Sequence, residues 1–289
     1  MTTTEPLISP AVRRRLARLG LSPEQAPAGS GLGGRVTPAD LPPSDADGSD
    51  PGPTGTADAL GAPTRSVPPI GPVLERARRR REDLTATAQL TSVTELDVTT
   101  SSGLPTAGGP SPERRAAAAR DVLADVVAAI HAAVRADPRL AATSDADLVL
   151  LRIPDAIDVG VVTSDPQGRE RRLVLRDPGA AGSTRAAVLA LLGTPGPPDD
   201  DPLLPIAAPV VVRDRTTSGV DFETTLLERP AALSLCLGAL ARQVRATAGP
   251  EVGVRWTAML SVTYDHRVID GADAARLLAT IRASVARSG

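Results

Sequence analysis

Hydrophobic residues recur at helical spacing in several parts of this chain. In residues 112–136 the apolar positions lie four apart, and in residues 271–285 they lie three or four apart. Such spacing gathers apolar side chains on one face and predicts two amphipathic helices, with shorter helices over residues 72–88 and 183–192. The buried positions are expected to be Val122, Val126, Ile130 and Val134 in the first helix, and Ala274, Leu278, Ile281 and Val285 in the last.

Other apolar runs have the length and alternation of strands. Residues 156–175 predict two strands around the turn Pro166-Gln167-Gly168, and residues 256–264 predict a long strand before the last helix. Further strands are expected over residues 91–98, 209–212 and 232–237. Helices and strands that mix along the chain in this way predict an α+β fold with a mixed β-sheet and flanking helices.

Proline, glycine and small polar residues interrupt these elements. Residues 42–66 predict an extended linker, and residues 101–111 and 195–205 predict loops. The linker separates a small module, residues 8–41, from a body formed by residues 67–289. In the module, Ser9-Pro10 predicts the start of one helix and Thr37-Pro38 the start of a second, with the glycine-rich segment 29–34 between them. The module is therefore expected to be a small all-α, two-helix unit.

The amino-acid composition excludes several kinds of chemistry. All 32 basic residues are arginine, so no lysine of this sequence carries a lipoyl group, forms a Schiff base or completes a phosphate loop. Three aromatic residues provide no platform for stacking bases, and the net charge of −2 gives no reason to expect a nucleic acid partner. Cys236 is the only cysteine, and the two histidines predict no metal site. Without a long apolar segment, no membrane association is expected and a cytoplasmic location is predicted.

The segment most indicative of chemistry lies between the last strand and the last helix. There His266 follows the strand end, and Asp270 stands four residues later at the expected helix start, before Gly271. Histidine is suited to take a proton from a hydroxyl or thiol near neutral pH. Asp270 is expected to cap the helix, and Gly271 to permit a close backbone approach. A structural role for the histidine is the alternative.

This segment resembles a known active-site motif. SVTYDHRVIDGADAARLL is similar to the HxxxDG segment of the dihydrolipoyl acyltransferase catalytic domain, whose superfamily includes chloramphenicol acetyltransferase. Residues 67–99 and 220–238 resemble two other parts of that domain. The resemblance implies a chloramphenicol-acetyltransferase-like fold and a CoA-dependent acyl transfer. His266 would be the general base, with Asp270 holding local structure, Asp265 and Gly271 structural at the site, and no bound cofactor beside acetyl-CoA as co-substrate. It also implies a homotrimer, or a multiple of trimers, with the site between subunits.

One position departs from that family. Where the family has a serine that stabilises the oxyanion of the intermediate, an ungapped comparison places Arg213. A small gap would bring Thr216, Thr217 or Ser218 there instead, and the sequence leaves these alternatives open.

The module has a resemblance of its own. Residues 8–41 are similar to the peripheral-subunit-binding domain of 2-oxoacid dehydrogenase acyltransferases. In that family the domain binds partner enzymes through basic residues, which makes Arg13, Arg14, Arg15 and Arg35 the candidates for a protein partner. A solvated helix face is the alternative.

Three functions fit these resemblances. The chain resembles lipoyl-free acyltransferases of tetronate polyketide pathways, which would make it an O-acetyltransferase acting on a primary hydroxyl of a small molecule in antibiotic biosynthesis. This is our main prediction. The alternatives are an acyltransferase core subunit of a 2-oxoacid dehydrogenase complex, transferring acyl groups between dihydrolipoamide and CoA, and a non-catalytic scaffold.

Overall fold

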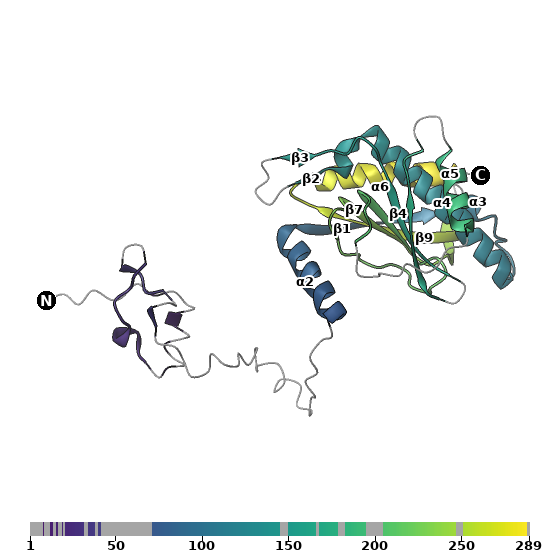
Figure 1. Ribbon diagram of the computed structural model, residues 1–289. Coiled ribbons are helices and arrows are strands. Elements are labelled where there is room, and N and C mark those ends of the chain that lie inside the picture. The colour runs from purple at the N-terminus through teal and green to yellow at the C-terminus, as the bar shows by residue number, and fades with distance from the viewer. Residues whose placement is uncertain are drawn as a thin grey trace, which may run out of the picture. The chain divides into compact units, whose positions relative to one another are not determined.

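The chain forms two compact units. A computed structural model describes residues 8, 12–13, 16, 19, 21–31, 34–37, 40–41, 71–144, 150–165, 168–178, 183–194, 205–246 and 251–287. The units are Met1–Pro68 and Pro69–Gly289 (Figure 1). The predicted linker, residues 42–66, lies outside the described residues, as does most of the predicted loop 195–205.

The small unit has a hydrophobic centre of its own. Its buried side chains are Val12, Leu16, Val36 and Leu41, and Val12 and Leu16 lie in a helical part of the chain. A short 3-10 helix, η1 (Pro23–Gln25), begins at a capping box of Ser22. Gly29 lies so close to the backbone of Arg35 that a Cβ there would be 2.2 Å from a carbonyl carbon. Only glycine fits this approach.

The helices of the large unit follow the predicted pattern closely. Ser111 begins α4, accepting a hydrogen bond from the Arg114 backbone N–H at 3.3 Å. All the predicted core positions of α4 and α6 are buried, and each large aliphatic side chain among them contributes about 1.5–3 kcal/mol. The helices are α2 (Gly71–Ala86), α3 (Thr99–Ser102), α4 (Pro112–Ala136), the 3-10 helix η5 (Pro138–Ala141), α5 (Thr184–Gly193) and α6 (Gly271–Val285).

A mixed seven-stranded sheet forms the centre of this unit. Its order is β1-β9-β7-β6-β4-β5, with β8 also paired to β9. Strands β4, β6 and β7 run parallel, whereas the other pairs are antiparallel, so the predicted α+β fold with a mixed sheet is confirmed. The strands are β1 (Gln89–Asp97), β4 (Val159–Ser164), β5 (Glu170–Leu175), β6 (Val210–Asp214), β7 (Leu233–Leu237), β8 (Ala241–Ala246) and β9 (Val252–Asp265), with β2 (Thr143–Ser144) and β3 (Leu151–Arg152) forming a separate hairpin.

Two local predictions differ from the structure. Strand β8 was not predicted, because its sequence, ARQVRA, has no run of alternating apolar residues and most of it is exposed. It pairs with the first half of β9, which extends beyond the residues paired with β7. The predicted loop 101–111 begins with the last two residues of α3.

The two faces of the sheet are covered differently. Helices α4, α5 and α6 lie on one face and enclose the main core (Figure 1). An irregular segment, residues 220–232, crosses the other face. There Ser261 Oγ donates to the carbonyl of Glu223 at 2.6 Å, and Thr225 Oγ1 donates to the carbonyl of Ser234 at 3.1 Å. This segment leads directly into β7 and defines the surroundings of the candidate site.

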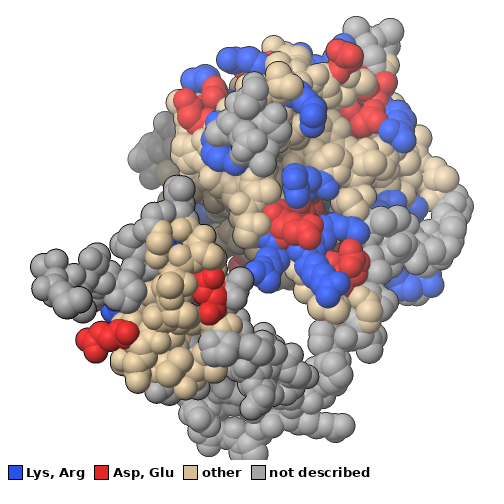
Figure 2. Space-filling view, turned by 60° about the vertical axis from the view of Figure 1, so that its left-hand side comes forward, with Lys and Arg blue, Asp and Glu red and all other residues tan. Residues whose placement is uncertain are grey.

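Charges on the surface are mixed. Arginines lie beside carboxylates on the face shown in Figure 2 rather than in a separate basic patch. Arg80 and Arg213 both lie near Glu228, at 3.0 and 3.6 Å, which illustrates this pairing. No helix among the described residues is long and apolar enough to cross a membrane.

Candidate active site

His266 lies in a tight turn between β9 and α6. Its side chain is exposed, and its backbone N–H donates to the carbonyl of Ala88 at 2.8 Å. The ring of the buried Tyr264 lies 6.1 Å from the imidazole, centroid to centroid. The turn therefore presents the imidazole to solvent from a backbone that the start of β1 holds in place.

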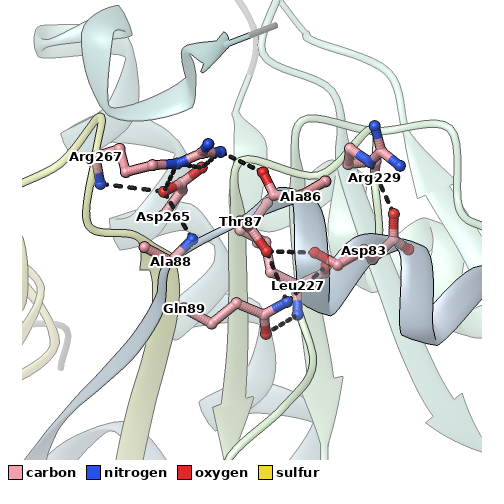
Figure 3. Close-up of polar contacts among 9 residues, drawn as sticks. All are labelled: Asp83, Ala86, Thr87, Ala88, Gln89, Leu227, Arg229, Asp265 and Arg267. Carbon is pink, nitrogen blue, oxygen red and sulfur yellow. Dashed lines mark hydrogen bonds and ion pairs between the residues drawn. The ribbon is translucent and has the colours of Figure 1, made fainter. Parts of the chain in front are cut away.

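A buried carboxylate braces this turn. Asp265 accepts hydrogen bonds from the backbone N–H groups of Ala88 and Arg267, at 3.2 and 3.1 Å, and from Arg267 Nε at 2.9 Å (Figure 3). Arg267 also donates to the carbonyl of Ala86. Burial alone would raise the pKa of Asp265, but the hydrogen bonds from Arg267 and Ala88 outweigh it and lower the pKa. Asp265 thus stays charged and ties the turn to the end of α2.

Asp270 caps α6, as predicted. Its carboxylate accepts from the Asp273 backbone N–H at 2.8 Å, and the Asp273 side chain completes a capping box. Hydrogen bonding from that N–H lowers the pKa of Asp270. The close backbone approach predicted at Gly271 does not occur within one chain. Among the described residues, a Cβ at Gly271 would have no neighbouring atom within 4 Å, so no close backbone approach there requires glycine.

The oxyanion candidates lie toward the other end of the sheet. Arg213 on β6 lies opposite Cys236 on β7, and Cys236 lies opposite Ser261 on β9. His266 is five residues beyond Ser261, a distance of about 17 Å at the usual rise of a strand. Because Thr216, Thr217 and Ser218 follow the end of β6, they lie farther still from His266. One chain therefore does not bring His266 and any of these candidates to one reacting carbon.

The four oxyanion candidates differ in whether their side-chain donors already form hydrogen bonds. The buried Thr216 hydroxyl donates to Asp214 at 2.6 Å, and the Ser218 hydroxyl donates to the carbonyl of Arg215 at 3.0 Å. Within the described part of the chain, the exposed Thr217 hydroxyl has no hydrogen-bond partner. Arg213 is mostly buried, and its guanidinium lies 3.6 Å from Glu228.

His131, the other histidine, belongs to the core. It is buried on α4, where Nδ1 lies 3.0 Å from the Thr184 hydroxyl and Nε2 lies 3.2 Å from Asp177. Burial lowers the pKa of His131, outweighing the opposing effect of the Asp177 charge. Cys236 is also fully buried, and burial raises its pKa to about 11.

This burial predicts an acid-sensitive fold. Because the folded pKa of His131 is below its ordinary value, the unfolded chain binds the proton more readily. The contribution of His131 to stability is therefore complete above the ordinary histidine pKa and is lost as the pH falls below about 6.5. Urea denaturation should show a smaller free energy of unfolding near pH 5 than near pH 7.

A pair of glutamine variants provides a matched comparison for this prediction. His131→Gln keeps hydrogen-bonding atoms but does not titrate, and should flatten the dependence of stability on pH. Thr280→Gln changes an exposed residue of α6 that does not titrate, and should leave that dependence unchanged. Equal slopes in the wild type and His131→Gln would contradict the assignment.

Several residues around the turn were not predicted. Gln89 binds the backbone of Leu227 twice, accepting from N–H at 3.0 Å and donating to the carbonyl at 3.3 Å. Asp83 forms an ion pair with Arg229 at 2.8 Å (Figure 3). These pairs join residues about 140 positions apart, so no local pattern in the sequence could have identified them.

Two regions of the chain match known family models. Residues 209–287 match the 2-oxoacid dehydrogenases acyltransferase (catalytic domain), and residues 6–41 match the E3 binding domain. The catalytic-domain match includes β6, the turn with His266 and the whole of α6.

Curated relatives agree with these matches. The dihydrolipoyllysine-residue acetyltransferase component of the pyruvate dehydrogenase complex of Mycobacterium bovis is 32% identical over 214 residues, or 71% of this chain. The match spans only 38% of that relative's length. The dihydrolipoyllysine-residue succinyltransferase component of the 2-oxoglutarate dehydrogenase complex of Escherichia coli is 27% identical over 286 residues, covering 95% of this chain and 69% of the relative.

Solved structures share the fold. A dihydrolipoamide acetyltransferase of Azotobacter vinelandii superposes with a TM-score of 0.58 at 19% identity, covering 86% of this chain and 96% of that one. A probable dihydrolipoamide acetyltransferase of Listeria monocytogenes gives the same score at 16% identity, covering 78% of this chain and 96% of that one. At this identity the likeness establishes the architecture alone.

Proposed function

Because this chain joins an E3-binding domain to a 2-oxoacid dehydrogenase acyltransferase catalytic domain, we propose that it transfers an acyl group between CoA and an acceptor. One observation carries the proposal. His266 is exposed in a turn braced by Asp265, within the region that matches the catalytic-domain model. An exposed imidazole on a rigid backbone has the chemistry and position of a general base.

The position of His266 supports the following reaction. His266 takes the proton of the acceptor's hydroxyl or thiol, and the acceptor attacks the thioester carbonyl of acyl-CoA. The carbonyl oxygen becomes an oxyanion. Its collapse breaks the bond to sulfur, and the CoA thiolate leaves and takes the proton from the imidazolium. Asp265 and Asp270 do not exchange protons in this scheme but hold the turn and the start of α6.

Completing the site requires a second copy of the chain. His266 and the oxyanion candidates are separated by about 17 Å or more along the sheet of one chain. A homotrimer or a multiple of trimers would place the β6 end of one chain beside His266 of its neighbour. Of the four candidates, Arg213 and Thr217 have donors that are not already hydrogen bonded within the described residues, and we assign the oxyanion to one of these two. Thr216 and Ser218 use their protons locally.

Two kinds of acyl acceptor fit this reaction. The relatives act on dihydrolipoyllysine residues, which makes a dihydrolipoyl group the first candidate acceptor. These 289 residues contain no lysine, so the lipoyl-lysine would come from outside this sequence. The second candidate is a primary hydroxyl of a small molecule such as a tetronate intermediate. An ungapped comparison with that family places Arg213 at the position of its serine, and this departure would favour an acceptor different from that of the relatives.

The N-terminal module would bind a protein partner. Arg13 and Arg35 are exposed, whereas Arg14 and Arg15 lie outside the described residues. A partner with an acidic surface would complement these arginines. We propose that the module docks such a partner onto the acyltransferase, as its match to the E3 binding domain suggests.

Mass spectrometry of the acylated acceptor tests the proposed reaction. The protein would be incubated with acetyl-CoA and either dihydrolipoamide or a hydroxymethyl tetronate, and we expect an acylated product with one of them. Product with dihydrolipoamide alone would support a dehydrogenase-type acceptor, and product with the alcohol alone would support O-acyl transfer. No product with either acceptor would contradict the proposal and favour a scaffold role.

A further inference from the structure

An apolar groove lies beside the hairpin of β2 and β3. It holds about 300 Å³, and a protein cavity of about 150 Å³ is enough to bind a benzene ring. Its wall consists of three alanines, three prolines and Ile153, together with Thr143 and Arg152. The side chains of Leu150, Leu151 and Ile153 are 59%, 56% and 49% exposed. Neighbouring exposed apolar side chains at an apolar groove are typical of an interaction site.

This groove lies at the His266 end of the sheet. Pro209 and Pro230 belong to its wall, and they stand just before β6 and β7 in the chain. Leu233 at the start of β7 lies opposite Tyr264 on β9, two residues before His266. Figure 1 shows β2 and β3 at the same end of the sheet, where α6 begins. A chain that enters the groove would therefore lie near His266.

The only phenylalanine of the chain lies exposed at the opposite end of the sheet. Phe222 is 52% exposed, and Val220 is exposed beside it. The Val220 carbonyl accepts from the Ala239 N–H at 2.8 Å, and the Thr216 carbonyl accepts from the Leu240 N–H at 3.3 Å, both just beyond the end of β7. Phe222 and the oxyanion candidates therefore share one end of the sheet.

The charges beside the groove and beside Phe222 are opposite. Arg152 lines the groove, Asp221 precedes Phe222, and both side chains are exposed. Within the residues that the structure describes, neither side chain forms an ion pair or a hydrogen bond. A Phe222 ring in the groove would bring the adjacent Asp221 close to Arg152. The two surfaces therefore complement each other in charge as well as in hydrophobicity.

The two surfaces cannot meet within one chain, because they lie at opposite ends of the same sheet. Complementary surfaces at different places on one molecule form a head-to-tail contact between copies, and such contacts close into a ring when the rotation between copies permits. The same contact would bring the β6 end of one chain toward His266 of the next. This is the arrangement that a site shared between chains requires.

We propose that Phe222 of one copy of the chain inserts into the groove beside the β2–β3 hairpin of the next copy, where Asp221 pairs with Arg152. Aromatic side chains are enriched in protein interfaces, and charged residues are depleted at their centre. This inference rests on the proposed function, which requires a second chain near His266, and it names the residues that make the contact. Phe222 then acts in assembly and not in catalysis.

Cysteine cross-linking of the full chain tests the contact. Asp221→Cys and Arg152→Cys would be made as separate variants, refolded together and oxidised with copper phenanthroline. The mixture should give a disulfide-linked dimer on a non-reducing gel, whereas each variant alone should not, since Cys236 is buried. Val244→Cys, at an exposed position of β8, replaces Arg152→Cys in the control mixture and should give no cross-link.

Sedimentation velocity measures the strength of the same contact. Phe222→Ser should raise the dissociation constant of the assembly by about 30-fold, the effect of truncating a residue that dominates an interface. Val244→Ser, at a similarly exposed apolar position, should leave it unchanged. Arg152→Asp and Asp221→Arg should each weaken the assembly, and a chain that carries both should recover, because the two charges are exchanged.

The results separate this inference from the proposed function. A cross-link formed by either cysteine variant alone, no cross-link in their mixture, or an assembly unaffected by Phe222→Ser would overturn the inference, even if the protein transfers acyl groups. A cross-link confined to the mixture of Asp221→Cys and Arg152→Cys would support it. Failure of acyl transfer in a protein that assembles through this contact would contradict the proposed function alone.

Discussion

Replacing His266 with alanine should lower kcat/KM for acyl transfer by about 10²–10⁴-fold, the contribution typical of a general base. The acceptor would then have to attack without losing its proton to a positioned group. Since the side chain is exposed and the turn is held through the His266 backbone N–H and Asp265, the fold should be retained. Product formation followed by mass spectrometry gives the rate, and circular dichroism checks the fold.

A surface variant serves as the control for this measurement. Thr280→Ala changes an exposed residue of α6 whose hydroxyl donates only to its own helix, at the Arg276 carbonyl. It should leave the rate unchanged. Activity of His266→Ala within a few-fold of the wild type would exclude the general-base role.

Oligomers assembled from two different variants test whether the oxyanion donor comes from a second chain. A double variant, Arg213→Ala with Thr217→Ala, removes both proposed oxyanion donors and should lose activity on its own, because one such donor is typically worth about 10²–10³-fold in rate. When it is refolded together with His266→Ala, about one interface in four should combine an intact base with intact donors. Activity should therefore return in the mixture. A mixture as inactive as its components would show that the site is not shared between chains in this way.

Replacing Gly238 with alanine should produce the largest loss of stability from a single added methyl group. A Cβ at this position would lie 1.7 Å from the carbonyl oxygen of Asp221, and the Gly238 N–H donates to the Met259 carbonyl at 2.8 Å. The atom in the way belongs to the backbone of segment 220–232, which cannot rotate aside as a side chain would. The free energy of unfolding should fall by about 1–3 kcal/mol or more, as for other overpacked cores.

Gly193 provides the matched control. An added Cβ at this last residue of α5 would meet only the Arg120 guanidinium, at an ordinary 3.7 Å. Gly193→Ala should be neutral or should stabilise the protein by up to about 1 kcal/mol through helix propensity. Urea denaturation of the two variants gives both values. Similar stabilities for Gly238→Ala and Gly193→Ala would mean that segment 220–232 does not cross the sheet as closely as described.

The helices and the reactive turn could be predicted because their signals are local. In α4 the spacing of Val122, Val126, Ile130 and Val134 reports the period of a helix, and all four are buried. Asp270 was identified as the α6 cap because a capping residue stands directly before its own helix. Strand β8 had no such signal, since its pairing with β9 depends on the length of β9 and not on its own apolar pattern.

The amino-acid sequence by itself determined the order of the main elements, the position of His266 at the end of a strand, and the absence of lysine chemistry from these 289 residues. Each of these follows from neighbouring residues or from composition. Only the tertiary structure decided that Asp265 is held by Ala88, 177 positions away, and that the oxyanion candidates lie along the sheet from His266. Such contacts depend on strand register and packing, which join distant segments and leave no periodic pattern in the chain.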